Sequence, residues 1–93
     1  MTVPYEFMMA VHLFLHTDNY QPHELKAAVA QRSEWIERIQ RQVDEVLQTR
    51  PVTVDWYAEH ANEGFDDEET LYRYLNEVYD YVFRDGPWPV TEG

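Results

Sequence analysis

The chain has 93 residues and no cysteine, and its 7 basic residues face 18 acidic ones, for a formal net charge of −11. Apolar residues make up 44% of the sequence and aromatic residues 15%, which suits one packed domain and excludes a disordered segment. The lack of cysteine excludes disulfides, thiolate metal sites and cysteine nucleophiles. We therefore expect a single domain over residues 1–93 in a reducing compartment, most simply the cytoplasm.

The charge is distributed unevenly along the chain. Residues 1–50 hold 7 acids and 5 bases, whereas residues 51–93 hold 11 acids and 2 bases. Such a surface repels phosphate backbones and anionic lipids and attracts basic proteins. Direct binding to nucleic acid or to a membrane is therefore disfavoured.

The first expected element is a helix over about residues 4–16. Phe7, Ala10, Val11, Phe14 and Leu15 form a broad apolar face, and Glu6 is the one charged residue. A helix that is apolar nearly all round lies in the centre of a bundle or is partly covered by a second chain. The apolar run of this segment is too short to span a membrane, and no basic segment precedes it as in a signal peptide.

The second expected element begins at Pro22, a residue tolerated in the first helical turn. From there an unbroken heptad phase, with Arg32 at one of its core positions, favours a single long helix over residues 22–49. The alternative is a break near Ser33, which can cap a second helix. A polar residue at a heptad core position sets register or partner choice in coiled coils, so we hypothesise that the long helix pairs with its copy in a homodimer.

Two further helices are expected in the acidic half of the chain. Thr53 can cap a short helix over about residues 54–62, and the spacing of Asp66 and Glu69 predicts a capping box for a last helix over residues 67–84. An irregular tail over residues 86–93 follows. No segment alternates like a strand, so the sequence predicts an all-α fold, a small bundle of three main helices and one short helix.

The last helix carries tyrosines on both sides of its apolar stripe, over an arc of roughly 200°. These rings either edge the protein's own core or form a face for a partner, because tyrosine joins a large apolar ring to a polar tip. Acids crowd the short helix and the start of the last one. The residues that we expect at a partner interface are Trp56, Tyr57, Asp66, Asp67, Glu68, Tyr72, Tyr74, Tyr79, Tyr81 and Trp88.

No metal, cofactor or catalytic site is predicted. His12 and His16 share a helical face, but position 13 is a leucine where zinc hydrolases of this spacing carry a glutamate after the first histidine. The single serine, Ser33, has no nearby histidine and no nucleophile-elbow motif. We therefore expect a protein that is not an enzyme.

Two function classes follow from these observations. The first is an acidic interaction module that binds and inhibits or escorts a basic protein, because carboxylates can stand where phosphates would bind. In size, helicity and acidity the chain is similar to the nuclease immunity proteins of bacteriocin systems, a similarity that no motif supports and that serves only as an analogy. The alternative is an assembly protein that self-associates through its long helix and its tyrosine-rich helix.

Overall fold

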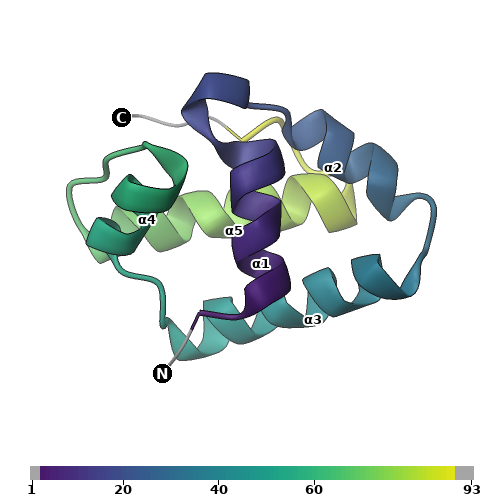
Figure 1. The fold of residues 1–93 in the computed structure, drawn as a ribbon, viewed down its shortest axis with the longest axis horizontal. Coiled ribbons are helices and arrows are strands. Elements are labelled where there is room, and N and C mark those ends of the chain that lie inside the picture. Colours follow the sequence, from purple (N-terminus) through teal and green to yellow (C-terminus); the bar gives the residue numbers. More distant parts are fainter. Residues whose placement is uncertain (1–2, 90–93) are drawn as a thin grey trace.

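The computed structural model describes residues 3–89 of the chain (Figure 1). Every regular element in this range is a helix, which confirms the all-α fold. The elements in chain order are α1 (Tyr5–Ala10), its π-helical continuation η1 (Val11–Leu15), the short 3₁₀ turn η2 (Thr17–Asn19), α2 (Pro22–Val29), α3 (Glu34–Thr49), α4 (Val54–Ala61) and α5 (Glu68–Arg84).

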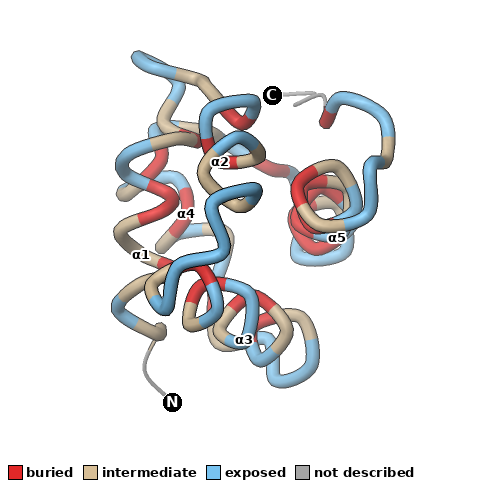
Figure 2. Tube along the Cα trace, turned by 90° about the vertical axis from the view of Figure 1, so that its right-hand side faces the viewer, coloured by how far each residue is buried: buried red, intermediate tan, exposed pale blue. Residues whose placement is uncertain are grey.

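The helices surround one core. α3 and α5 run in opposite directions, and α1 crosses in the foreground of Figure 1 with α4 beside it. The view of Figure 2, turned by 90°, places α1 and α4 on the side of the molecule opposite α5, with their buried positions turned inward. α1 packs against α3, whereas α2 and α3 both pack against α5.

The core consists of apolar side chains at helical spacing. The apolar stripe expected on the last helix is buried, and so are the main apolar positions expected in the other helices. Core residues buried on these stripes are Phe7, Val11 and Leu15, then Leu25, then Ile36, Ile39, Val43 and Val46, and finally Leu71, Leu75, Val78 and Val82. Because Val11, Ile39, Val46 and Leu71 are fully buried, α1–η1, α3 and α5 are held mainly by apolar burial.

The expected helix over residues 22–49 is wrong: α2 and α3 are separate helices. The chain leaves α2 through hydrogen bonds from Gln31 N to Ala28 O and from Arg32 N to Val29 O, and Arg32 has a φ of +53°. The Ser33 hydroxyl then accepts a bond of 3.3 Å from Ile36 N and begins α3. Arg32 lies in this turn, so the continuous seam expected for a homodimer does not exist.

Side-chain caps fix the starts of the two helices in the acidic half. The Thr53 hydroxyl accepts a hydrogen bond of 3.0 Å from Trp56 N, as expected for this cap. The capping box expected from Asp66 and Glu69 is wrong. Asp67 is the capping residue instead, and its carboxylate accepts from Thr70 N at 2.9 Å. The one-residue shift arises because α5 begins at Glu68, which puts Asp67 just before the helix.

The segment after α5 turns back along the molecule. Pro89 is buried, and its carbonyl oxygen accepts a hydrogen bond of 3.0 Å from the Tyr20 hydroxyl. Residues 86–89 are irregular, as expected, while residues 90–93 of the expected tail lie outside the described part of the chain.

Candidate functional site

Four tyrosines expected at a partner interface lie in the core of this chain. Tyr57, Tyr72, Tyr74 and Tyr79 are all buried, with exposures of 0%, 2%, 2% and 9%. The rings therefore offer no surface to a partner, and this part of the expected site is corrected. Three of the four tyrosines lie on α5, which α2 and α3 cover, so a wide aromatic arc fits inside the molecule. Tyr57 lies on α4, and its ring packs against Phe65 and Tyr74.

The hydroxyl groups of these tyrosines differ in their surroundings. Tyr72 donates to Val52 O at 2.8 Å and accepts from Val52 N at 2.9 Å. Tyr74 is joined to the Tyr20 hydroxyl at 2.9 Å. The Tyr57 hydroxyl is buried and makes no hydrogen bond with any described residue. Burial raises the pKa of both Tyr57 and Tyr74, which keeps the two phenols neutral in the folded protein.

Tyr81 and Trp88 form a separate aromatic cluster at the C-terminal end of α5. The Trp88 ring packs against Tyr81 at 5.4 Å, against Tyr20 at 6.0 Å and against His23 at 5.9 Å between centroids. Lys26 lies over the Tyr81 ring at 4.6 Å. This cluster attaches the C-terminal segment to α2 and α5.

The acidic residues of α4 and of the turn before α5 remain at the surface. Asp67 caps α5, and its pKa is lowered by its hydrogen bonds to Thr70. Glu69 is bonded to Arg50 at 2.9 Å, which lowers the pKa of that carboxyl. Within residues 54–69, the carboxylates of Asp55, Glu59, Glu63, Asp66 and Glu68 make neither an ion pair nor a side-chain hydrogen bond with any other described residue, and we call these five the acidic face. No lysine or arginine occurs between Pro51 and Tyr72 to offset them.

A histidine pair that the sequence did not predict joins η1 to α4. His12 Nε2 and His60 Nδ1 are 2.9 Å apart, and the His60 ring stacks on Trp56 with centroids at 4.2 Å. Trp56 also contacts Phe7 of α1, at 6.1 Å. His12 thus pairs with a residue 48 positions away, and a helical wheel that compares it with His16 has no means of showing this.

The histidine pair has the geometry of a hydrogen bond and not of a metal site. Its ring centroids are 5.1 Å apart, as for two imidazoles placed end to end, so the facing nitrogens point at each other rather than at a common third position. No group of three or more potential metal ligands occurs among residues 3–89. A second contact beside it, from Asn62 Nδ2 to Thr17 Oγ1 at 3.0 Å, strengthens the attachment of α4.

The outward face of α1 and η1 is apolar and uncharged. Tyr5 is 64% exposed and Leu13 46%, with the half-buried Met9 between them. Glu6, the one charged residue of this segment, is held by Arg38 at 3.1 Å and Gln42 at 2.8 Å on the side toward α3. The hydrogen bond from Gln42 is the main cause of a lowered pKa at Glu6.

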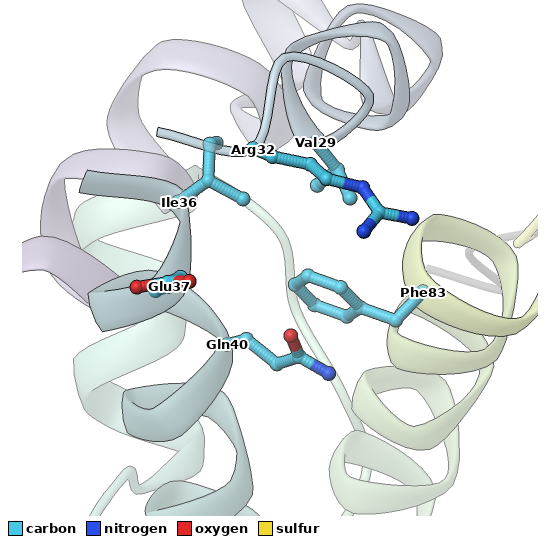
Figure 3. A pocket seen from close by; sticks show the side chains of 6 residues that line it. All are labelled: Val29, Arg32, Ile36, Glu37, Gln40 and Phe83. Carbon is cyan, nitrogen blue, oxygen red and sulfur yellow. The ribbon is translucent and has the colours of Figure 1, made fainter. Parts of the chain in front are cut away.

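A hollow of about 240 Å³ lies between the turn after α2 and the end of α5 (Figure 3). Val29, Ile36 and Phe83 supply apolar surface, and Figure 3 shows the Arg32 guanidinium reaching across it toward α5. Glu37 and Gln40 complete the lining. The lining holds no histidine, serine or metal-ligand cluster, and its two charged residues have opposite signs. These residues therefore indicate neither a catalytic site nor a particular ligand.

Comparisons with protein-family models, with curated proteins and with solved structures give no match. Among the described residues, no helix is both long and apolar enough to cross a membrane. The chemistry of the described surface is therefore the basis for a functional proposal.

Proposed function

We propose that this protein is an interaction module whose acidic face binds a basic protein and inhibits or escorts it. The observation that carries the proposal is the acidic face, whose five carboxylates make no ion pair with any described residue and lie on and after α4, the helix that also carries the Trp56–His60 stack. Unpaired surface charges of one sign raise the local concentration of an oppositely charged partner and speed its association. The adjacent aromatic ring adds apolar contact area, which is what anchors most interfaces.

The second function class, self-assembly through a long helix and a tyrosine-rich helix, loses two supports. α2 and α3 are separated by the turn at Arg32, and Tyr72, Tyr74 and Tyr79 are buried within one chain. A homo-oligomer would also bring together two chains that each carry a net charge of −11. The absence of enzymatic activity and a cytoplasmic location stay predictions.

The proposal is tested by affinity capture from a lysate of the source cell at about 50 mM and about 500 mM salt, because screening weakens exposed charge pairs. The bait is compared with a variant in which the acidic face carries amides. Its substitutions are Asp55→Asn, Glu59→Gln, Glu63→Gln, Asp66→Asn and Glu68→Gln.

A matched control variant has the same net charge as the acidic-face variant but keeps all five carboxylates of the acidic face. Its substitutions are Glu24→Gln, Glu37→Gln, Asp44→Asn, Glu45→Gln and Asp80→Asn. We expect one basic protein to be retained at low salt by the wild type and by the control, and to be lost at high salt and with the acidic-face variant. Equal retention of the same proteins by all three baits at both salt concentrations would contradict the proposal.

A further inference from the structure

The geometry points to the class of partner: we infer that the surface formed by α1, η1 and α4 binds a basic amphipathic helix. We define the α1–α4 face as Tyr5, Met9, His12, Leu13, Asp55, Trp56, Glu59 and His60. The inference rests on the proposed function and deepens it, because it names the shape and chemistry of the segment that the acidic face would receive.

The apolar half of the α1–α4 face follows from helix geometry. Tyr5, Met9 and Leu13 are spaced by four residues, so they lie along one side of the helical segment. Tyr5 and Leu13 are two of the three large apolar residues exposed in residues 3–89. Contiguous apolar surface that is left uncovered is where contacts with other proteins form, whereas single scattered apolar residues need no explanation.

The acidic half lies alongside this stripe. The His12–His60 bond of 2.9 Å and the Phe7–Trp56 contact of 6.1 Å hold α4 against α1 and η1, and Figures 1 and 2 both show the two elements on the same side of the molecule. Asp55 and Glu59, four residues apart on α4, are exposed beside Trp56. The helical segment that carries the apolar stripe therefore packs against the helix that carries these two carboxylates.

This pattern selects one kind of occupant. A second copy of the chain would place the α4 carboxylates of one copy against carboxylates of the other. Repulsion between these like charges would weaken binding. Strand addition needs a sheet edge, and residues 3–89 contain no strand. Helix-on-helix packing remains, with apolar residues of the partner on the stripe and its lysines or arginines toward Asp55 and Glu59.

The test uses a synthetic peptide of about 18 residues, with leucines at positions i, i+3, i+4 and i+7 and lysines elsewhere. The probe is titrated into the full chain at about 50 mM salt, and binding is followed by calorimetry. We expect Tyr5→Ser with Leu13→Ser to weaken binding about tenfold, and Asp55→Asn with Glu59→Gln to weaken it by a similar factor and to reduce its salt dependence. Trp88→Ser, at the third large exposed apolar residue, serves as the matched control and should leave the affinity unchanged.

A scrambled peptide of the same composition separates this inference from the proposed function. If the scrambled and the amphipathic peptide bind equally, and Tyr5→Ser with Leu13→Ser changes neither, the inference fails while the acidic face still captures basic chains. If neither lysine peptide binds, the proposed function fails as well. If the chain instead sediments as a dimer that the Tyr5 and Leu13 substitutions dissociate, a second copy occupies this face and the inference is overturned. Circular dichroism confirms that every variant folds.

Discussion

The hydroxyl groups of two buried tyrosines give a controlled comparison at the scale of single residues. Tyr72 forms two hydrogen bonds with the backbone of Val52, whereas Tyr57 forms none with any described residue. Tyr72→Phe leaves a buried N–H and carbonyl unpaired, and we expect it to lower the free energy of unfolding by about 1–3 kcal/mol. Tyr57→Phe removes a hydroxyl that is buried without a partner, so stability should stay equal or rise. Urea denaturation of both variants measures the difference, and equal losses would contradict this assignment.

Glu6 makes the stability of the fold depend on pH. Its pKa is lowered, first by the hydrogen bond from Gln42 and then by Arg38, so its carboxylate form is favoured in the folded state. This contribution is present above the ordinary carboxyl pKa of about 4.5 and is lost as the pH falls through the lowered value. We expect Glu6→Gln to be less stable than the wild type at neutral pH. The difference should shrink as the pH falls below about 4.5, as measured by urea denaturation at neutral and at acidic pH, and a constant difference would refute the role of the charge.

Single-residue signals in the sequence were informative where the chemistry is local. Thr53 and Pro22 begin their helices as predicted, because a cap or a first-turn proline acts within a few residues. The pairing of His12 with His60 depends on how α4 packs against η1. No spacing rule on one helix reports such a contact, so this part of the candidate site required the structure.

At the scale of elements, the turn between α2 and α3 is held by Ser33 and strained at Arg32. We expect Ser33→Ala to lower stability by about 1 kcal/mol, since Ile36 N loses its partner. Arg32→Gly should be neutral or stabilising, because glycine adopts a φ of +53° without steric cost. Thermal unfolding followed by circular dichroism distinguishes the two. A loss on Arg32→Gly as large as that on Ser33→Ala would show that the arginine side chain holds the turn.

The heptad phase correctly predicted several buried residues but wrongly predicted one continuous helix over residues 22–49. Leu25, Ile36 and Val43 all reach the core, because both α2 and α3 present apolar residues to it at steps of three and four. Apolar residues at this spacing show which side of each helix is buried, but they do not show where one helix ends and the next begins. The cap at Ser33 was therefore the better indication of the boundary.

The tyrosines of α5 show a similar ambiguity. A wide aromatic arc indicates either a partner or cover from several elements of the same chain, and the sequence left both readings open. The contacts of α5 with α2 and α3, together with the burial of Tyr72, Tyr74 and Tyr79, decide for the second reading. The candidate interface therefore moves from α5 to the opposite side of the molecule.

At the scale of the whole molecule, the charge should oppose folding. The net charge of −11 includes the acidic face, whose carboxylates lie on α4, on the following turn and at the start of α5. Screening of this repulsion should raise the melting temperature as salt increases, by about 4–8 °C for each kcal/mol relieved. The acidic-face variant should show a smaller rise than the control variant of equal net charge. Identical salt responses in the two variants would mean that the repulsion is not concentrated on the acidic face.

The central claim is that the α1–α4 face binds a basic helix, and residue-resolved NMR tests it most directly. The leucine–lysine peptide is added to the ¹⁵N-labelled chain, and amide shifts are mapped on the structure. We expect the largest shifts in α1, η1 and α4, including Leu13 and Glu59, with α3 and the outer side of α5 unchanged. Shifts centred on α3 and α5, or spread evenly over all exposed acids, would contradict it.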